Sequence, residues 1–323
     1  MVEQVRVGFI GTGGMARHHM DILTKIDAVK ITAVYDLNKS SAEEVASQYG
    51  AQSFNDELQL LDSGLIDALY ICTPPSTRGT IEIQAAARGL HLLSEKPVGL
   101  QMETVNQVRA AIDQAGIINS SGYCLRYQQN VQKAKQYLAD KQVNMVVGYR
   151  IGSLPPAKWF AQMHMSGGQL VEQSTHQVDI IRYIIGDFAE AKAVYAQRSI
   201  RQIDSEATIP DVGVVSFTMQ SGAIGSFINS CVSNYHGRSD IEVYGPDYYL
   251  KIDGGTLIIR DAHQQLEETY QTDYYAEQSK AFVAAVRANN QRLVLGSYGD
   301  AADTLAATLA FNQAAEQREP VKI

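Results

Sequence analysis

Near the start of the chain stands the stretch Val5-Arg6-Val7-Gly8-Phe9-Ile10-Gly11-Thr12-Gly13-Gly14-Met15-Ala16. Its first half is mostly apolar and predicts a strand that ends at residue 10, whereas residues 15–26 have the pattern of a helix. Between them, residues 11–16 fit G-x-G-x-x-A, in which the first glycine makes a tight turn and the second lets the backbone approach a pyrophosphate. The N–H groups and the positive dipole of the helix start would then face that anion. Taken alone, the hexapeptide is equally compatible with a glycine-rich turn that binds no ligand.

A carboxylate follows at the distance that such a turn requires. Asp36 follows the expected strand 30–35 and lies 20 residues after Ala16, where an acid that binds the adenosine ribose is expected. Alternatively Asp36 caps the next helix, but Ser40 and Glu43 form a capping box for helix 40–48. A carboxylate repels a 2′-phosphate, so NAD is expected, although Lys39 keeps NADP open as the less favoured cofactor. The sequence thus predicts NAD binding by Gly11, Thr12, Gly13, Gly14, Met15 and Asp36.

The segments that follow alternate between strand and helix patterns. Strands are expected at 5–10, 30–35, 68–72, 91–94 and 117–121, and helices at 15–26, 40–48, 77–88 and 103–114. Alternation of this kind implies right-handed βαβ units and a parallel sheet with helices on both faces. We therefore predict an α/β chain whose residues 1–122 form an N-terminal Rossmann domain with a parallel sheet.

The pattern changes after residue 122. Helices are expected at 128–139 and 168–185, and strands at 212–220, 223–232, 241–244, 248–252 and 256–260 follow without intervening helices. The turns at 220–222 and 253–255 suit hairpins. Residues 123–323 therefore predict a C-terminal α/β domain with an open, mostly antiparallel sheet. Of the two closing helices, at 276–289 and 299–317, we expect the last to pack back on the Rossmann domain.

Composition excludes several classes of protein. A chain of 323 residues is longer than a single domain with one hydrophobic core usually is, so two domains are expected. Its 45% hydrophobic and 19% charged residues are typical of a folded protein. The net charge of -8 argues against a nucleic-acid partner. Cys72, Cys124 and Cys231 form no CxxC pair, and no metal-ligand spacing occurs, so neither a disulfide framework nor a metal site is expected. The apolar run near the N-terminus is too short for a signal peptide or a membrane span, so we expect a cytoplasmic protein without a membrane partner.

Two further segments follow expected strands, at the sheet edge where open α/β sheets bind ligands. Thr73-Pro74-Pro75 comes after strand 68–72, and Glu95-Lys96-Pro97 comes after strand 91–94. A lysine at this edge could donate a hydrogen bond to a reacting hydroxyl and repel the proton that leaves it. From the tripeptide alone, an exposed Glu–Lys pair of negligible energetic value is the favoured interpretation.

A third segment, residues 167–179, carries His176. If this segment is one helix, Glu172 and His176 stand at i and i+4 on one face, and Asp179 lies three residues further along it. An imidazole titrates near neutral pH and is a natural acceptor for a hydroxyl proton, and Glu172 could orient it. A structural pair on the flank of a helix is the alternative, and the spacing alone favours that alternative.

Taken together and in order, these segments resemble the glucose–fructose oxidoreductase, myo-inositol dehydrogenase and rhizopine-catabolism family. The resemblance spans nearly the whole chain, and its most specific piece is Glu95-Lys96-Pro97. It implies a Rossmann domain followed by an open-sheet domain, and in the family this sheet commonly forms the subunit interface. A homodimer or homotetramer through the C-terminal sheet is therefore expected. The other pieces are residues 11–16, Asp36, Thr73-Pro74, Gly122-Tyr123, Arg126-Tyr127, Gly167-Gly168, His176, Asp179 and the closing helix 300–316.

The resemblance also implies roles for individual residues. Lys96 is similar to the family lysine that contacts nicotinamide and substrate, and His176 to the histidine that accepts the substrate proton, with Glu172 beside it. The implied activity is the reversible NAD-dependent oxidation of a secondary hydroxyl on a sugar, inositol or related cyclic polyol. Thr73, Pro74 and Glu95 are implied to line the cofactor cleft, and Tyr123, Arg126, Tyr127 and Trp159 lie in segments implied to face the substrate.

Three departures from the family pattern put details in doubt. Glu172 stands where an Asp is common, Arg78 where a histidine often follows Thr-Pro, and Ser174 where a glycine precedes the catalytic histidine. Two other activities stay compatible with the resemblance. One is NAD-assisted glycoside cleavage, in which transient oxidation activates elimination, and the other is a catalytically inactive NAD-binding sensor.

Overall fold

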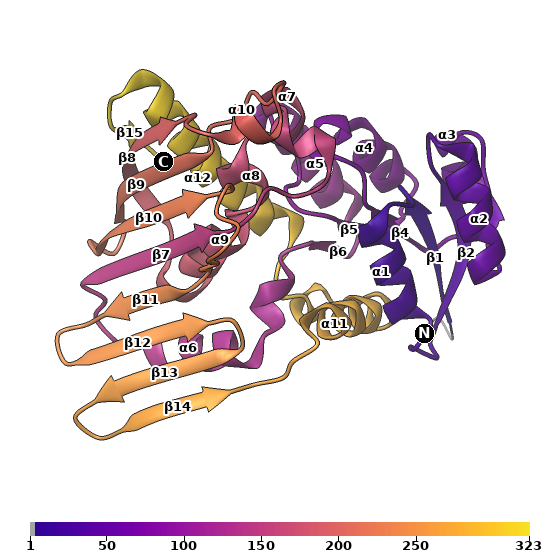
Figure 1. The fold of residues 1–323 in the computed structure, drawn as a ribbon. Helices are drawn as coiled ribbons and strands as arrows, with labels where there is room; N and C mark the ends of the chain where they lie inside the picture. Colours follow the sequence, from indigo (N-terminus) through magenta and orange to yellow (C-terminus); the bar gives the residue numbers. More distant parts are fainter. Residues whose placement is uncertain (1–3) are drawn as a thin grey trace. The chain divides into compact units, whose positions relative to one another are not determined.

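The computed structural model describes residues 4–323 and divides into two compact units (Figure 1). Unit 1 runs to Cys124 and includes Asp273–Ala302, and unit 2 holds Leu125–Thr272 and Asp303–Ile323. Residues 273–302 therefore group with the N-terminal unit. The elements of unit 1 are β1 (Val5–Ile10), α1 (Gly14–Leu23), β2 (Val29–Tyr35), α2 (Lys39–Tyr49), β3 (Gln52–Ser53), α3 (Glu57–Asp62), β4 (Ala68–Ile71), η1 (Pro75–Thr77), α4 (Thr80–Ala87), β5 (His91–Ser94), α5 (Met102–Ala115), β6 (Asn119–Ser121), α11 (Tyr274–Ala288) and η4 (Gln291–Leu293).

The sheet of unit 1 has six strands in the order β3-β2-β1-β4-β5-β6, and every neighbouring pair is parallel. This is the strand order of a doubly wound dinucleotide-binding sheet, in which the chain reverses direction between β1 and β4. Ligands of such sheets bind at that reversal, beyond the carboxyl ends of the strands. The predicted Rossmann sheet is therefore confirmed.

Apolar side chains from strands and helices fill the core of unit 1. The rings of Phe9 and Tyr70 stack with centroids 5.0 Å apart, and Phe282 of α11 meets Tyr70 edge-on at 5.7 Å. Met20 of α1 is also fully buried in this cluster. Helix α11 thus completes the core of the N-terminal unit although it lies some 150 residues later in the sequence.

The sheet of unit 2 has nine strands in the order β14-β13-β12-β11-β7-β10-β9-β8-β15. Only the pair β7 and β10 is parallel within this described sheet, and the other pairs are antiparallel. The predicted open, mostly antiparallel sheet is thus confirmed. The elements of unit 2 are α6 (Gln129–Leu138), β7 (Met145–Ile151), η3 (Lys158–Ala161), α7 (Met163–Ser166), α8 (Gln169–Glu172), α9 (Thr175–Ile185), β8 (Phe188–Ala196), α10 (Ile200–Ile203), β9 (Val212–Met219), β10 (Ile224–Ser230), β11 (Ile241–Tyr244), β12 (Tyr248–Asp253), β13 (Thr256–Asp261), β14 (Gln265–Thr269) and β15 (Val321–Lys322); η2 (Cys124–Tyr127) and α12 (Tyr298–Gln317) cross the unit boundary.

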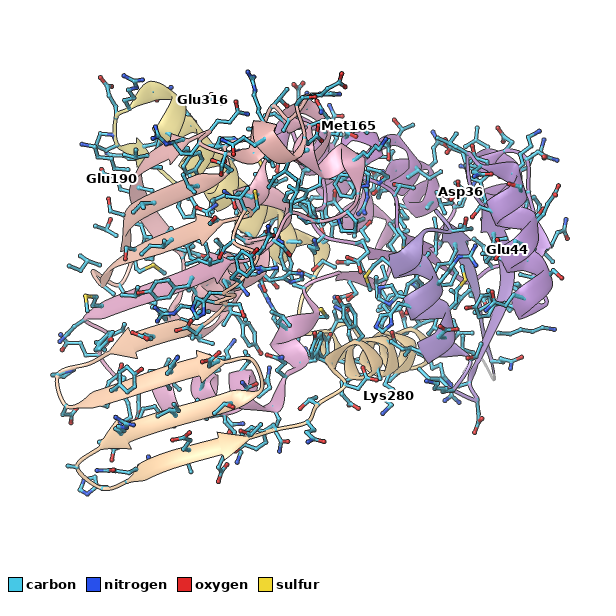
Figure 2. All side chains as sticks on the ribbon, in the orientation of Figure 1. Asp36, Glu44, Met165, Glu190, Lys280 and Glu316 are labelled. Atoms are coloured by element: carbon cyan, nitrogen blue, oxygen red, sulfur yellow. The ribbon has the colours of Figure 1, made fainter. Side chains whose placement is uncertain are left out.

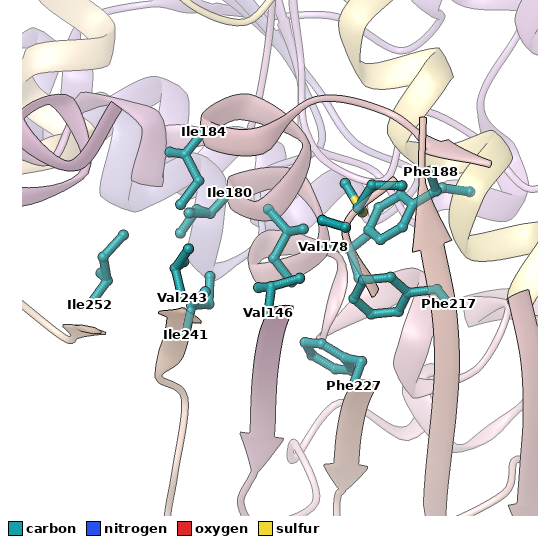
Figure 3. Packing of buried hydrophobic residues seen from close by; sticks show 14 of the residues in the cluster. Val146, Val178, Ile180, Ile184, Phe188, Phe217, Phe227, Ile241, Val243 and Ile252 are labelled. Carbon is teal, nitrogen blue, oxygen red and sulfur yellow. The ribbon is translucent and has the colours of Figure 1, made fainter. Parts of the chain in front are cut away.

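One face of this sheet is covered by helices and carries the core. Val146, Phe217 and Phe227 project from β7, β9 and β10 into a cluster with Val178 of α9 (Figure 3). Burial alternates residue by residue along β9, because successive side chains of a strand point to opposite faces. The opposite face therefore carries the residues between these core positions, and several of them are apolar and exposed.

Two element predictions are wrong, and both bear on the site. Helix α2 begins at Lys39 with Asn38 as its N-cap, which accepts a hydrogen bond from the Ser41 N–H, so Ser40 does not cap it. The predicted helix 168–185 is two helices, α8 and α9, which are separated at residues 173–174. The expected strands, the two hairpins and both closing helices are confirmed within a few residues.

Candidate functional site

The strand register of unit 1 gathers the predicted cofactor segments at one sheet edge. Ile10 pairs with both Tyr35 and Ile71, and Ile71 pairs with Ser94. The residues that follow these strand ends are aligned in the same way. Gly11, Asp36, Cys72 and Glu95 consequently stand side by side where a doubly wound sheet binds its ligand.

The glycine turn after β1 leaves an open space above the start of α1. Gly11 has a φ of +91°, and a methyl group there would lie 2.8 Å from the Cys72 carbonyl oxygen. A methyl group on Gly13 or Gly14 would meet no atom of the described chain within 4 Å. Among the residues described, no side chain caps the first turn of α1. These N–H groups are thus available to an anion such as a pyrophosphate.

Asp36 is held beside this turn (labelled in Figure 2). Its Oδ2 accepts hydrogen bonds from the Thr12 N–H at 2.7 Å and the Thr12 hydroxyl at 2.9 Å, and its Oδ1 accepts one from the Asn38 N–H at 2.8 Å. Asp36 therefore does not cap α2. A carboxylate has about four lone-pair positions, so Asp36 can still accept from the hydroxyls of a ribose. Gly13, Gly14 and Asp36 thus form a cradle that fits a dinucleotide with an unsubstituted ribose.

Arg78 joins the loop after β4 to the loop after β5. Its Nε and Nη2 donate to the Thr73 carbonyl oxygen at 3.1 and 2.6 Å, and its Nη1 donates to the carbonyl oxygen of Glu95. Arg78 is buried. The residue that departs from the family pattern thus fixes the backbone of Thr73-Pro74 against that of Glu95-Lys96.

A buried hydrogen bond between His19 and Glu95 fixes the Glu95 side chain. His19 of α1 and Glu95 are both buried, with Nε2 and Oε1 2.8 Å apart, and Glu95 Oε2 accepts the Lys96 N–H at 3.0 Å. Burial alone would raise the pKa of Glu95, but the hydrogen bond from His19, together with the charges of Lys96 and Arg78, lowers it to about 2. Glu95 is therefore an anion that fixes the backbone at Lys96, whose own side chain is half-buried.

The loop after β6 closes this edge of unit 1. A methyl group at Gly122 would lie 2.4 Å from Glu95 Oε2, so glycine is required for the close approach of the two loops. The next residue, Tyr123, is only 1% exposed. The predicted substrate-binding tyrosine is therefore packed inside the protein.

In unit 2, the segment with Glu172 and His176 has an irregular backbone. The Ser174 N–H donates to the carbonyl oxygen of Gln169, five residues earlier, instead of four as in a regular α-helix. Glu172 consequently ends α8, and His176 lies in the first turn of α9, so the predicted i, i+4 pair on one continuous helix is wrong. Both side chains are half-buried.

Arg126 and Asp179 form a buried ion pair in unit 2. Arg126 Nε and Nη2 donate to the two carboxylate oxygens of Asp179 at 2.8 and 2.7 Å, and the Thr304 hydroxyl donates to the same carboxylate at 2.9 Å. The guanidinium also lies 4.8 Å from the ring centroid of Tyr183. Arg126 is 2% exposed, and Tyr127 beside it is buried too. This geometry gives Arg126 a structural role and leaves its predicted contact with substrate a prediction.

The remaining predicted side chain, Trp159, lies in η3. It is half-buried and packs against a small cluster that includes Phe160, Ile200 and Cys231. No three His, Cys, Asp or Glu side chains of residues 4–323 gather as a metal site. Within the same residues, no helix is both long enough and apolar enough to cross a lipid bilayer.

Two family models match the chain, one in each half. Residues 5–123 match the oxidoreductase family with an NAD-binding Rossmann fold, and residues 131–250 match the GFO/IDH/MocA C-terminal domain. The chain belongs to the GFO/IDH/MocA oxidoreductase family. It is an NAD-dependent dehydrogenase that acts on CH–OH groups, and the cradle of Gly13, Gly14 and Asp36 fits that cofactor.

Curated relatives and solved structures agree with this membership. The chain is 26% identical to myo-inositol 2-dehydrogenase of Thermotoga maritima, over 99% of this chain and 98% of the relative. It is 29% identical to scyllo-inositol 2-dehydrogenase (NAD(+)) of Bacillus subtilis, over 80% and 75% of the two chains. A levoglucosan dehydrogenase solved with NADH and L-sorbose superposes with a TM-score of 0.89 over 99% of each chain, at 19% identity, which shows the shared fold.

The candidate site also contains residues that the sequence did not single out. One is His19, and the other is Arg78, which the sequence showed only as a departure from the family pattern. Their positions depend on side chains that meet across the sheet, His19 with Glu95 and Arg78 with Thr73. Such meetings leave no periodic signal along a single sequence.

Proposed function

We propose that this dehydrogenase oxidises a secondary hydroxyl of a sugar, an inositol or a related cyclic polyol, with Lys96 and His176 as its catalytic residues. The observation that carries the proposal is the cradle at the sheet edge of unit 1, where the Glu95-Lys96 backbone is fixed beside the dinucleotide turn. The family relatives support the substrate class, since several are named inositol dehydrogenases.

In the proposed reaction, His176 and Lys96 have different roles. When bound, nicotinamide supplies an acceptor for the hydride that leaves the carbon bearing the hydroxyl. His176 accepts the hydroxyl proton, because a neutral imidazole is a competent base near neutral pH. Lys96 donates a hydrogen bond to the hydroxyl oxygen and stabilises negative charge on it. Glu172 stays a predicted partner of His176, without the helical i, i+4 geometry that first suggested it.

We propose further that the chain assembles as a homodimer or homotetramer through the sheet of unit 2. Its face opposite the helices carries exposed apolar side chains, with Val194, Val214 and Ile224 exposed by 68%, 50% and 56%. The strand registers place Val194 opposite Val214, and Ile224 opposite Met145, so these side chains share one face. An exposed apolar surface of this kind favours association. The cytoplasmic location stays a prediction from the sequence.

The proposed function is tested by NADH formation from NAD with a panel of inositols, aldoses and cyclic diols. The wild type is compared with Lys96→Met and His176→Ala, and Lys280→Met serves as control because Lys280 is exposed and pairs with Glu277 on α11. We expect turnover on at least one class of polyol and a loss of about 100-fold or more in either catalytic variant, the range for general acid–base groups.

Three results would contradict the proposal. Tight NAD binding with no turnover on the whole panel would favour the sensor. Glycoside cleavage with retained cofactor and no net NADH would favour NAD-assisted elimination. Full activity of both catalytic variants would exclude the roles assigned to Lys96 and His176.

A further inference from the structure

A half-buried arginine in unit 2 lies outside the residues assigned to cofactor binding, proton transfer and assembly. Arg150 lies near the end of β7, and its guanidinium makes no hydrogen bond or ion pair within residues 4–323. Burial lowers the pKa of Arg150, and the charge of Glu172 acts in the opposite direction. Since an arginine stays protonated in proteins, a cation is held here with part of its hydration removed and without a bonded counter-ion.

Arg150 lines a cavity of about 440 Å³ that lies within unit 2. This volume is in the range of small-molecule sites. Every residue that lines it is neutral or basic, and the polar ones include Ser153, Gln173, Asn234 and Ser239. The Oε1 atom of Gln173 is buried and has no hydrogen-bond partner in the described part of the chain. Two polar groups of the cavity, on β7 and between α8 and α9, are thus left unsatisfied by the protein.

A second arginine of the cavity, Arg238, differs from Arg150 because it is paired with carboxylates. Arg238 donates to Asp240 Oδ1 at 2.6 Å and to Glu242 Oε1 at 2.9 Å, and its guanidinium lies 3.4 Å from the ring centroid of Tyr149. Its charge is therefore compensated by carboxylates of its own unit. Arg150 is the arginine of this cavity that is available to a ligand.

Backbone hydrogen bonds hold the walls of the cavity together. Ile151 and Arg238 exchange N–H···O bonds of 2.7 and 2.9 Å, and the Ser233 N–H donates to the Gly152 carbonyl oxygen at 2.9 Å. The end of β7 is thereby fixed against the loop that precedes β11. A preformed site binds its ligand without the entropic cost of ordering a loop.

The cavity borders the segment that carries the predicted base. Gln173 lines it, Glu172 is the charge that acts on Arg150, and His176 follows three residues after Gln173. We propose that Arg150 binds an oxyanion of the substrate, a carboxylate or a phosphate, so that the preferred substrate is an acidic sugar or polyol. The planar guanidinium matches such groups with two parallel hydrogen bonds. This inference rests on the proposed function, and it adds the charged substituent to the substrate class.

The test compares neutral polyols with their anionic counterparts. Binding to the protein with NAD present is measured by calorimetry for D-glucose, D-glucuronate and D-glucose 6-phosphate, and for myo-inositol and myo-inositol 1-phosphate, and NADH formation is followed in parallel. The variants are Arg150→Gln, Arg150→Lys and the control Arg260→Gln, which removes an exposed positive charge on β13. Thermal unfolding of each variant establishes that it is folded.

We expect at least one anionic compound to bind better than its neutral parent. Arg150→Gln should reduce this preference by about ten- to 100-fold, the effect of losing a hydrogen bond to a charged group. Arg150→Lys should retain part of the preference, and Arg260→Gln all of it. Comparing D-glucuronate with the phosphorylated compounds shows whether the site prefers a carboxylate or a phosphate.

A second variant moves the guanidinium without removing it. A methyl group at Gly152 would lie 2.9 Å from Arg150 Nη1. Gly152→Ala should therefore displace the Arg150 guanidinium and weaken anion binding. Equal affinity of wild type and Arg150→Gln for every anionic compound would overturn the inference. Arg150-dependent binding without any NADH formation would support the anion site and contradict the proposed function instead.

Discussion

At the scale of single residues, the pair of His19 and Glu95 connects the first helix to the predicted catalytic lysine. Both side chains are buried, and no water is needed to join them, since Nε2 and Oε1 are 2.8 Å apart. Glu95 is a buried anion, so removing His19 would leave its carboxylate without one of its hydrogen-bond donors. The pair should therefore be sensitive to substitution at either position.

We predict that His19→Ala lowers the free energy of unfolding by about 1.5 to 3 kcal/mol, because the Glu95 carboxylate would lose a hydrogen-bond donor. His19→Gln should recover part of this loss, since its amide can donate to Glu95. The matched control is His18→Ala at the exposed neighbour, which should change stability by about 0.5 kcal/mol or less. Urea unfolding of the three variants measures these differences, and similar values for His18→Ala and His19→Ala would contradict the role of the pair.

The same carboxylate predicts a dependence of stability on pH. The pKa of Glu95 falls from an ordinary 4.5 to about 2 in the folded protein. Its stabilising contribution, about 3 kcal/mol, is therefore complete above pH 4.5 and is lost as the pH falls from 4.5 towards 2. The difference in unfolding free energy between wild type and Glu95→Gln should shrink over this window. A difference that stays constant with pH would show that Glu95 titrates alike in both states.

At the scale of elements, the turn between β1 and α1 contains two glycines for which we expect different roles, one in folding and one in cofactor binding. Gly11 has a positive φ, and a Cβ there would lie 2.8 Å from the Cys72 carbonyl oxygen, whereas Gly13 has a φ of -68° and a Cβ there would meet no described atom within 4 Å. We therefore expect the first glycine to be needed for the fold and the second for cofactor binding.

Alanine at these two positions should give opposite results. Gly11→Ala should destabilise the protein by about 1 to 3 kcal/mol, from a strained backbone and a close contact. Gly13→Ala should change stability by about 1 kcal/mol or less, while its methyl group weakens NAD binding at least about tenfold. Thermal unfolding without cofactor and fluorescence titration with NADH distinguish the two effects. Unchanged NADH affinity in Gly13→Ala would exclude pyrophosphate binding at this turn.

The sequence predicted elements well where a pattern is local, and poorly where it depends on distant contacts. The strand, glycine turn and Asp36 stand where the spacing predicted them, because each follows from a short-range rule. The break at residues 173–174 was missed, since the side chains around it have a helical period while Ser174 bonds to Gln169 instead of Leu170. Arg126 was expected at the substrate, and its burial against Asp179 was not foreseen, because their 53 residues of separation hide the pair. The short elements β3 and α3 carry too few residues for a periodic signal.

At the scale of the whole molecule, the two units carry residues with different proposed roles. Unit 1 holds the dinucleotide cradle and Lys96, and unit 2 holds His176 and the Arg150 cavity. The sheet of unit 2 also presents the apolar face that we assign to assembly. The proposed roles in binding, chemistry and association thus belong to different residues, which can be varied independently.

We predict that the double variant Val214→Asp and Ile224→Asp is a monomer, because two carboxylates would be buried in the proposed interface. Both side chains are at least half exposed in the chain by itself, so its fold should be retained. Light scattering after size-exclusion chromatography gives the mass, and Leu37→Asp is the control at an exposed position of unit 1. An unchanged mass of the double variant would place the interface elsewhere.

Direct oxidation of the secondary hydroxyl is tested by following the hydride from substrate to cofactor. The best substrate of the polyol panel is prepared with deuterium on the carbon that carries the reacting hydroxyl, and the NADH produced is analysed by mass spectrometry. We predict one deuterium in each NADH, and transfer slowed by about 100-fold or more in Lys96→Met and His176→Ala. NADH without deuterium, or product formed with no NADH at all, would contradict direct oxidation of the secondary hydroxyl.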